Sequence, residues 1–399
     1  MRLFINSLAA SAGGGLTYIR NVIPHLISTP GVEVAILAGP GIRQEFLALR
    51  NVEFMELEVS AARRFWYEQF QLPSLLRSWH AHILLSTGNF ALRNSPVPQI
   101  LLSRNSIYTS ADFYRDLRSR HEYRMWLDTH IRAALARRSI HWANVTVAPS
   151  EAFASQLRRW SRANQIVSIH HGFDPENFTG DCNPLPSDVE QKLLAAAGSF
   201  KLLFVSHYNY YRNFETLLRA LPAIREAVTG RDMKLLLTCK LAAGENPGAY
   251  KPEKAAQLVR ELGLADTVIE LGAIPYRQLH HLYRRADIYV SPAYTETFAH
   301  PLVEAMFCGL PIVTSDLPVH REICADAALY FPRFSSDALA RCVLELYRKP
   351  ENARRLATIG RDRSSLFSWK RHVHEILNVC EKLLANDLRS QADGSTPAS

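Results

Sequence analysis

The chain has 399 residues, of which 47% are hydrophobic and 21% charged, and this composition excludes a disordered or fibrous protein. Its length suffices for two domains with separate cores, and it contains no apolar run of the about 18 residues that a membrane-spanning helix needs. The net charge of +8 favours anionic partners such as nucleotide sugars or anionic lipid, and no motif supports nucleic acid as a partner.

Apolar stretches of strand length alternate with helical stretches from the N-terminus onward. This alternation predicts parallel sheets that are covered by helices on both faces. The first strand begins at once, without the pattern of a signal peptide. In the first half the predicted strands are 3–6, 32–37, 52–55, 83–85, 99–102, 145–147 and 166–169.

A second series of strands follows a turn-rich stretch, which we interpret as an interdomain linker. These strands are predicted at 202–205, 234–237, 268–271, 288–290 and 312–314. The sequence therefore predicts two doubly wound, Rossmann-like α/β domains that face a cleft. The expected division is a first domain at 1–178, a linker at 179–190, a second domain at 191–366, a C-terminal helix at 367–386 and a disordered polar tail at 387–399.

The patterns of cysteines and arginines do not indicate a specific function. The six cysteines have no metal-ligand spacing and fit reduced thiols of a cytosolic enzyme. A run of arginines from Arg115 to Arg138 is interleaved with aromatic residues. One interpretation is a basic amphipathic surface that contacts anionic lipid headgroups or a lipid-diphosphate acceptor. The other is a solvated helix face beside core aromatics. Interspersed acidic residues favour the second interpretation, and we expect a cytoplasmic protein, with peripheral contact to the inner face of a membrane left open.

The segment 291–315 carries the most informative pattern, with Glu296 and Glu304 on either side of a strand-to-helix junction. Pro301 suits the first turn of a helix, where its missing N–H costs no hydrogen bond. Gly309 ends that helix. Glu296 is therefore expected after the carboxyl end of a strand, which is where open α/β sheets bind ligands, and Glu304 in the helix that follows.

This segment resembles the E-x7-E signature of the retaining family 4 glycosyltransferases, which have the GT-B fold. The match includes Phe298 and the run Glu304-Ala305-Met306, and it departs at Ala299, where glycine is usual, and at His300, where a hydrophobic residue is usual. An ordinary strand-loop-helix with a capping acid and a solvated acid is the alternative. The resemblance implies a nucleotide-sugar donor, UDP- or GDP-linked, and no cofactor.

Residues 205–213 correspond to the family's Gly-Arg-x-x-x-x-Lys-Asn segment. By this resemblance Arg212 takes the place of the lysine and His207 that of the arginine. A cation at a helix N-terminus is suited to a diphosphate leaving group, whose negative charge must be stabilised. His207 donates a hydrogen bond but carries a full charge only when it is protonated.

The resemblance also assigns roles in the E-x7-E segment. Glu296 is expected near the transferred sugar, as the catalytic partner of Arg212, and Glu304 is expected to accept hydrogen bonds from the donor ribose. The backbone amides of Phe298, Ala299 and His300 are expected to meet sugar hydroxyls or phosphate, and a histidine at 300 to tune donor or acceptor choice.

Two further sites are expected in the first half. The loop 11–17 contains Gly14 and Gly15 and resembles the family's Gly-Gly loop at the donor, with a simple tight turn as the alternative. Many relatives carry a His-Asp pair where this chain has Arg104 and Asn105, so these two are candidates for the acceptor side. The run His170-His171 resembles a family turn at the domain junction and is interpreted as structural.

The prediction is a glycosyltransferase that retains anomeric configuration and needs no metal, acting on a glycan or lipid-linked acceptor in surface or extracellular polysaccharide synthesis. The sequence contains neither an Asp-x-Asp motif nor a His/Cys cluster with metal-ligand spacing, so it does not indicate a bound metal. A noncatalytic sugar-nucleotide-binding or partner protein, or a GT-B epimerase or phosphorylase, are the alternatives. A dehydrogenase is disfavoured because no dinucleotide fingerprint follows any strand.

Overall fold

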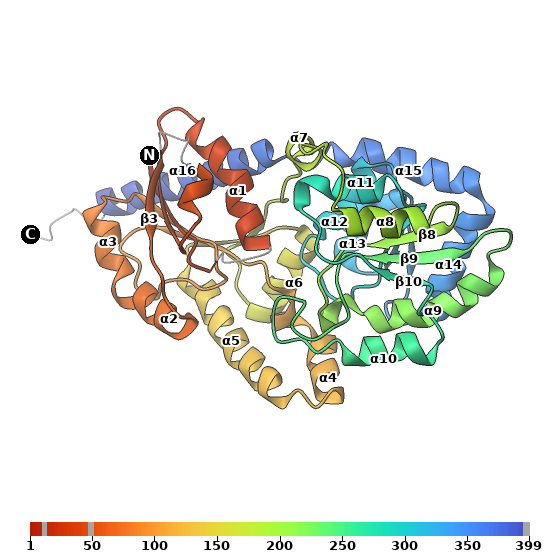
Figure 1. Ribbon diagram of the computed structural model, residues 1–399. Helices are drawn as coiled ribbons and strands as arrows, with labels where there is room; N and C mark the ends of the chain where they lie inside the picture. Colours follow the sequence, from red (N-terminus) through yellow and green to blue (C-terminus); the bar gives the residue numbers. More distant parts are fainter. Residues whose placement is uncertain (10–13, 47–51, 394–399) are drawn as a thin grey trace, which may run out of the picture. The chain divides into compact units, whose positions relative to one another are not determined.

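The computed structural model describes residues 1–9, 14–46 and 52–393, which divide into two compact units (Figure 1). The first unit comprises residues 1–109, 122–172 and the chain from Ser368 onward. The second unit comprises residues 110–121 and 173–367. Each unit is an α/β structure around one parallel sheet.

In the first unit, seven strands of the described chain pair in the order β3-β2-β1-β4-β5-β6-β7, and every pairing is parallel. The order reverses between β1 and β4, where Leu3 pairs with Ile83. Most of the strands are near-continuous apolar runs because both faces of a parallel sheet are buried, whereas the edge strand β3 alternates apolar residues with glutamates. They are β1 (Arg2–Asn6), β2 (Glu33–Ala38), β3 (Val52–Glu56), β4 (Ile83–Ser86), β5 (Gln99–Leu102), β6 (Val145–Ala148) and β7 (Ile166–Ser168).

One face of this sheet is covered by α1 and α16, which pack against each other. Ile19 and Val22 of α1 and Val373 and Ile376 of α16 belong to the same buried cluster as the strand residues. The C-terminal helix therefore belongs to the core of the first unit. The helices of this unit are α1 (Gly14–Ile27), α2 (Ala61–Phe70), α3 (Leu72–Ser78), α5 (Tyr123–Trp142), α6 (Glu151–Ser161) and α16 (Trp369–Asp393).

In the second unit, six described strands form a parallel sheet in the order β10-β9-β8-β11-β12-β13. The order reverses between β8 and β11, where Leu202 pairs with Ile288. This switch point is the place at which the loops after two neighbouring strands diverge to opposite faces of the sheet. The strands are β8 (Phe200–Phe204), β9 (Met233–Leu237), β10 (Val268–Glu270), β11 (Ile288–Ser291), β12 (Ile312–Ser315) and β13 (Ala328–Phe331).

Helices cover both faces of the second sheet, with α9 and α10 on one side and α8, α11 and α12 on the other (Figure 1). Helix α14 packs against α9, and α15 packs against α12. The helices of this unit are α4 (Ala111–Ser119), α7 (Pro175–Phe178), α8 (Ser187–Ala195), α9 (Phe214–Ala227), α10 (Glu253–Glu261), α11 (Leu279–Tyr283), α12 (His300–Phe307), α13 (Pro318–Cys324), α14 (Ser336–Arg348) and α15 (Pro350–Ser364).

The fold class expected from the sequence is confirmed, and each predicted strand is present within a residue or two of its expected bounds. Strand β13 was not predicted. It is the short apolar run Ala328–Phe331 at the edge of the second sheet, and the sequence analysis assigned no strand to it. None of the described helices is both long and apolar enough to cross a membrane.

The observed division of the chain differs from the expected one at residues 110–121, which include α4 and belong to the second unit. Charged and polar contacts hold this segment there. Arg120 pairs with Glu215 at 2.7 Å, and the hydroxyl of Tyr294 donates to Asp116 at 2.9 Å. Contacts between residues so far apart in sequence leave no mark in the local pattern.

The expected linker at 179–190 and the expected tail at 387–399 also differ from the structure. Residues 173–367 form one unit, in which the linker stretch packs on the segment before α11 and runs into α8. Arg277 donates to the carbonyl of Gly180 at 2.9 Å, so the turn-rich stretch is fixed by hydrogen bonds. Helix α16 continues to Asp393, and residues 394–399 lie outside the described residues.

We expect Gly172→Ala to destabilise the first unit, because a Cβ there would lie 2.0 Å from the backbone nitrogen of Trp369 at the start of α16. The two backbones must separate, at a cost of about 1–3 kcal/mol in the free energy of unfolding. Urea denaturation measures the loss. The control Gly39→Ala adds a Cβ with no neighbour within 4 Å, and equal stability of both variants would contradict the prediction.

Candidate active site

The candidate site lies at the carboxyl ends of β8 and β11, on the two sides of the switch point of the second sheet. The loop after β8 carries His207 and Arg212, and the loop after β11 carries Glu296. Loops at such a point leave room for a ligand beyond the strand ends. The sheet order therefore brings together residues that are far apart in the sequence.

Two asparagines shape the loop after β8. The side chain of Asn209 accepts a hydrogen bond from the backbone N–H of Arg212 at 3.1 Å, which caps the short 3-10 turn Tyr210–Arg212. Asn213 adopts φ 57°, and its side-chain amide donates to the carbonyl of Pro292 at 3.0 Å. Asn213 thus ties the loop after β8 to the loop after β11.

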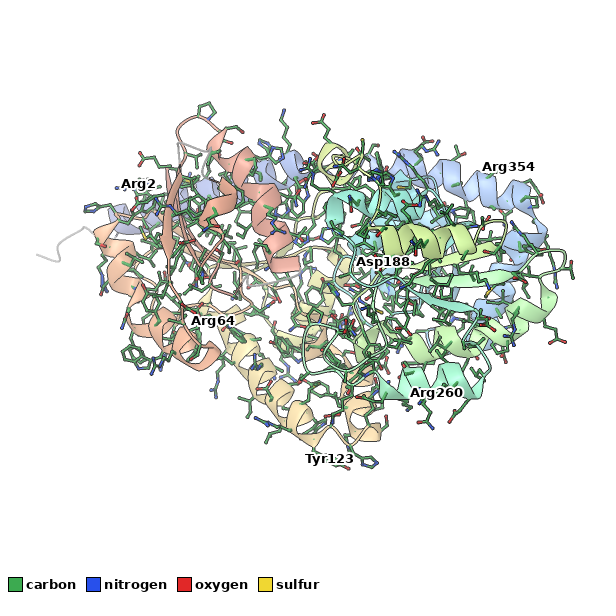
Figure 2. All side chains as sticks on the ribbon, viewed as in Figure 1. Arg2, Arg64, Tyr123, Asp188, Arg260 and Arg354 are labelled. Carbon is green, nitrogen blue, oxygen red and sulfur yellow. The ribbon has the colours of Figure 1, made fainter. Side chains whose placement is uncertain are left out.

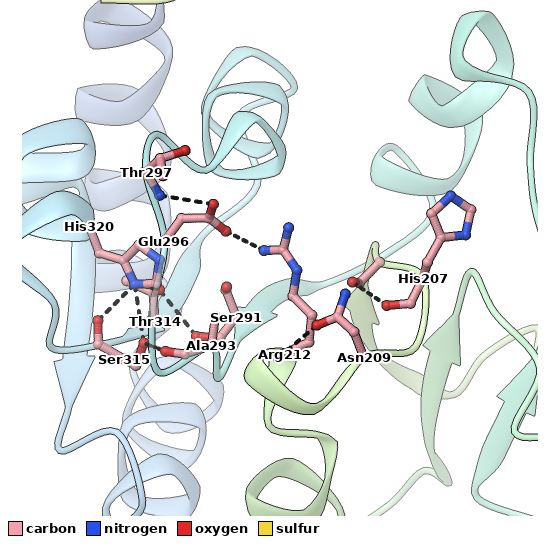
Figure 3. Close-up of polar contacts among 11 residues, drawn as sticks. His207, Asn209, Arg212, Ser291, Ala293, Glu296, Thr297, Thr314, Ser315 and His320 are labelled. Carbon is pink, nitrogen blue, oxygen red and sulfur yellow. Dashed lines mark hydrogen bonds and ion pairs between the residues drawn. The ribbon is translucent and has the colours of Figure 1, made fainter. Parts of the chain in front are cut away.

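Arg212 and Glu296, the two predicted catalytic residues, form an ion pair (Figure 3). The exposed fractions of their side chains are 20% and 11%. Burial by itself lowers the pKa of the Arg212 guanidinium, but the adjacent Glu296 carboxylate outweighs it and raises the pKa above its ordinary value. Glu296 also accepts a hydrogen bond from the backbone N–H of Thr297 at 3.1 Å. Arg212 therefore stays a fixed cation, held by the carboxylate across the switch point.

His207 occupies the same loop but does not act as a second fixed cation. Its ring points away from Glu296 in Figure 3 and is exposed. Partial desolvation and the nearby charge of Arg212 lower its pKa below the ordinary 6.5, so the ring is neutral at pH 7. It remains able to donate or accept one hydrogen bond.

Ala299 is the residue before α12, and its backbone is left-handed, with φ 66° and ψ 61°. Glycine takes up this conformation without the steric cost that a Cβ adds. This explains why glycine is usual at the position and identifies the alanine as a strained substitution. Its neighbour Phe298 is 1% exposed and packs on Phe367, with ring centroids 5.4 Å apart, while His300 begins α12 at the surface side.

Glu304 lies in α12 and is 4% exposed. The hydroxyl of Tyr283 donates to its carboxylate at 2.7 Å. Burial raises the pKa of Glu304 to about 7, although the Tyr283 hydrogen bond acts in the opposite direction. A ligand with hydroxyl donors, such as a ribose, would stabilise the ionised form of this carboxyl.

Sequence reasoning missed His320, a fully buried residue of α13 that lies beside Glu296 in Figure 3. Burial lowers its pKa to about 4, although the Ser315 carbonyl and Glu296 act in the opposite direction. The only signal in the sequence is a histidine soon after a buried strand, which is weak by itself. Tyr283, the partner of Glu304, carried no signal either.

The candidate site residues predicted in the first half of the sequence all lie in the first unit. Gly14 and Gly15 open α1, and residues 11–13 of their loop lie outside the described residues. Arg104 follows β5 and donates to the carbonyl of Thr87 at 2.7 Å, with its guanidinium 5.1 Å from the ring centroid of Tyr18. Burial lowers the pKa of Arg104 to about 10. Asn105 accepts from the N–H of Ile107 at 3.3 Å, which makes it a turn residue in this structure.

Within the described ranges, no group of three or more His, Cys, Asp and Glu side chains is arranged to hold a metal ion.

His171 is buried against Tyr18 and Trp369, with ring centroids 5.5 Å and 5.4 Å away. This packing suits the structural role that the sequence analysis assigned to it.

Two family models match consecutive parts of the chain. The model described as Glycosyltransferase Family 4 matches residues 12–177, and the model described as Glycosyl transferases group 1 matches residues 187–363. The chain belongs to glycosyltransferase family 4. The family that the E-x7-E segment indicated is thereby confirmed.

Curated relatives of this family 4 chain are about a quarter to a third identical to it within the aligned segments. A D-inositol 3-phosphate glycosyltransferase of Nocardiopsis dassonvillei is 27% identical over 247 residues, which is 60% of this chain and 56% of that protein. An O-antigen chain mannosyltransferase B of Escherichia coli is 32% identical over 114 residues, 28% of this chain and 30% of that one. The first of these matches spans little more than half of the relative, and the second less than a third.

Solved structures share the fold of this family 4 chain over almost its full length. A sucrose-phosphate synthase of Thermosynechococcus elongatus superimposes with a TM-score of 0.73 at 19% identity, covering 97% of this chain and 100% of that one. HepE of Anabaena in complex with UDP-glucose gives a TM-score of 0.69 at 16% identity, covering 96% and 100%. The two parallel-sheet units are those of the GT-B fold.

We expect Ala299→Gly to raise the free energy of unfolding by about 1 kcal/mol, because glycine relieves the left-handed strain before α12. Urea denaturation of the whole chain measures the change. Ala305→Gly, in the interior of α12, is the matched control and should destabilise. A loss of stability in Ala299→Gly would contradict the assigned backbone conformation.

We expect the stability of the wild type to fall relative to Glu304→Gln as the pH rises from 5 to 8. The folded pKa of about 7 lies above the ordinary 4.5, so the stabilising proton is present below pH 4.5 and is lost as the pH rises through 7. The shift corresponds to roughly 3 kcal/mol. Thermal denaturation at intervals of pH measures both proteins, and parallel curves would show that Glu304 is not buried as described.

Proposed function

We propose that this chain is a glycosyltransferase that moves a sugar from a nucleotide-diphosphate sugar to a glycan or lipid-linked acceptor, in surface or extracellular polysaccharide synthesis. The observation that carries the proposal is the Arg212–Glu296 pair at the switch point between β8 and β11. It supplies a fixed cation and a carboxylate at the strand ends where ligands bind in open α/β sheets. Membership of family 4 supports the same reaction class.

Arg212 is suited to the diphosphate of the donor. Its guanidinium is a permanent cation with several N–H donors in a fork that matches phosphate oxygens. In this structure the Glu296 carboxylate contacts one nitrogen of the fork, Nη1. The diphosphate takes over the guanidinium when the donor binds, and Glu296 is then released toward the sugar.

Transfer with retention needs no group beyond these two and the substrates themselves. The bond between the anomeric carbon and the diphosphate oxygen breaks, and Arg212 stabilises the charge that develops on the leaving group. The acceptor oxygen bonds to the anomeric carbon on the same face, and its proton passes to the leaving phosphate oxygen. Glu296 stabilises the positive charge on the sugar, and no metal is required because Arg212 supplies the neutralising charge.

The donor base is proposed to be uracil or guanine. Structures of Anabaena HepE contain UDP and UDP-glucose, on a fold that this chain shares. The matching relatives include glycosyltransferases for D-inositol 3-phosphate and an O-antigen mannosyltransferase. These names support a nucleotide-sugar donor and a hydroxyl acceptor on a polar or glycan substrate.

Peripheral contact with an anionic membrane is proposed for α5. Tyr123, Leu127 and Ile131 recur at helical spacing on this helix and are 59%, 55% and 61% exposed. Figure 2 shows Tyr123 at the start of α5, on the outside of the ribbon. The exposed arginines Arg124 and Arg132 lie along one side of the stripe, and Arg132 pairs with Asp128 at 2.7 Å. An apolar stripe beside basic side chains fits the headgroup region of an anionic lipid surface and favours a cytoplasmic face.

A noncatalytic sugar-nucleotide-binding protein with the same fold is the second candidate. The neutral His207 and the strained Ala299 favour it, because both weaken the phosphate-binding loops relative to the family pattern. Donor binding without donor turnover distinguishes this candidate from the enzyme.

We expect the wild type to turn over one UDP- or GDP-sugar in the presence of EDTA and to lose that activity in Arg212→Ala. Removing a group that stabilises charge in the transition state costs about 10²-fold or more in rate. The measurement is nucleotide release with the acceptor present, and NMR of the product is expected to show the donor's anomeric configuration.

The matched control is Arg219→Ala, which removes an exposed arginine of α9 outside the site. A folded Arg212→Ala protein with wild-type turnover would exclude the assigned role of Arg212. Donor-induced thermal stabilisation of the wild type without any turnover would favour the noncatalytic candidate.

A further inference from the structure

His320 is a buried polar side chain next to the candidate site that the proposed mechanism does not use. It lies in α13, directly after β12, and its exposed fraction is 0%. Its ring interacts electrostatically with Glu296, Arg212 and Asp316. Figure 3 shows the ring beside the Glu296 side chain.

The hydrogen bonds around the ring determine which nitrogen carries the proton. The Nδ1 atom lies 2.9 Å from the carbonyl oxygen of Ser315, which only accepts, so Nδ1 must donate. Two hydroxyls also face Nδ1, from Thr314 at 2.8 Å and from Ser315 at 3.2 Å. Both hydroxyls donate their own protons to backbone carbonyls of the adjacent strand and the loop after it, so they present lone pairs to the ring.

Those carbonyls belong to the last residue of β11 and to the loop that follows it. The Thr314 hydroxyl donates to the carbonyl of Ser291 at 3.2 Å, and the Ser315 hydroxyl donates to the carbonyl of Ala293. Glu296 is three residues further along the same loop. The chain of hydrogen bonds thus runs from His320 through β12 to the segment that presents Glu296 to Arg212.

The second ring nitrogen, Nε2, is buried and has no hydrogen-bond partner among the described residues. An unpartnered buried polar atom destabilises the fold, so an apolar side chain would fill this space at lower cost. An apolar side chain would not donate to the Ser315 carbonyl. The polar contact at Nδ1 is therefore what a histidine adds here.

Whether Nε2 carries a proton determines the charge that the ring presents to Glu296. A proton on Nε2 would turn the ring into a cation within electrostatic reach of Glu296, in competition with Arg212. Burial lowers the pKa of the ring to about 4, so the ring is neutral at pH 7. Arg212 opposes protonation, and Glu296 and Asp316 favour it.

We propose that His320 is a positioning residue for Glu296, which holds the ends of β11 and β12 together as a neutral ring protonated at Nδ1. This role rests on the proposed transferase function, in which Glu296 acts on the sugar. His320 touches no substrate, and it fixes the loop from which Glu296 reaches the anomeric centre. Loss of the Nδ1 donor frees that loop without removing either member of the ion pair.

The test compares His320→Leu, His320→Asn and His320→Gln in the full chain. The amide of asparagine reaches the place of Nδ1 and keeps a donor for the Ser315 carbonyl, whereas that of glutamine reaches the place of Nε2. We expect His320→Leu to lower kcat for transfer about tenfold or more with little change in the donor KM, which reports loss of transition-state stabilisation. His320→Asn should recover most of kcat, and His320→Gln should not.

His280→Leu is the matched control, because His280 is also buried in the second unit and contacts a backbone carbonyl, that of Phe178, at 3.2 Å. It should lower the melting temperature without the selective loss of kcat. Equal losses in His320→Asn and His320→Leu, or a kcat loss in His280→Leu that matches the loss in His320→Leu, would overturn the proposal. If His320→Leu does not fold, equal activity of the asparagine and glutamine variants overturns it.

Two readouts separate this proposal from the transferase function itself. Nitrogen-15 NMR of histidine-labelled protein at pH 7 should show His320 neutral with the proton on Nδ1, and a proton on Nε2 would overturn the proposal. Amide hydrogen exchange at residues 296–299 should be faster in His320→Leu than in His320→Asn. Both hold even if the wild type turns over no donor, an outcome that would sink the proposed function alone.

Discussion

The ion pair between Arg212 and Glu296 is the constraint on which the candidate site depends. Two opposite charges that are mostly withdrawn from water are tolerated only as partners, because either one alone would keep the full cost of desolvation. The pair therefore requires the loops after β8 and β11 to approach each other at the switch point. The bond from Asn213 to the Pro292 carbonyl serves the same approach through the backbone.

Burial decides the charge state of the groups around this pair. It raises the pKa of Glu304 and lowers the pKa values of His207 and His320, so all three are held nearer to neutrality than the same side chains in water. Arg212 remains charged because its carboxylate partner outweighs the same effect. The proposed donor site consequently relies on one arginine for the leaving diphosphate, where the family pattern has two cations.

A second set of buried charges decides which segments of the chain belong to the second unit. Arg120 contacts both Asp116 and Glu215 at 2.7 Å, and its guanidinium lies 4.2 Å from the ring centroid of Tyr210. The two carboxylates outweigh the effect of burial and raise the pKa of Arg120. Tyr210 belongs to the 3-10 turn that ends at Arg212, so the segment 110–121 packs against the turn that presents this arginine. A segment from the first half of the sequence thus becomes part of the second unit.

The sequence by itself determined every strand except β13, the two-sheet α/β class and the family. Buried parallel strands must be apolar runs, and the E-x7-E segment combines a strand, a proline at a helix start and a glycine at a helix end, all of which are local signals. It also placed Arg212 and Glu296 after their strands. Only the tertiary structure decided that they pair, that α4 joins the second unit, and that His320 and Tyr283 stand beside the two acids. These depend on sheet order and on charges that meet across 84 residues for Arg212 and Glu296 and 95 residues for Arg120 and Glu215. Neither sheet order nor desolvation is encoded in a local pattern.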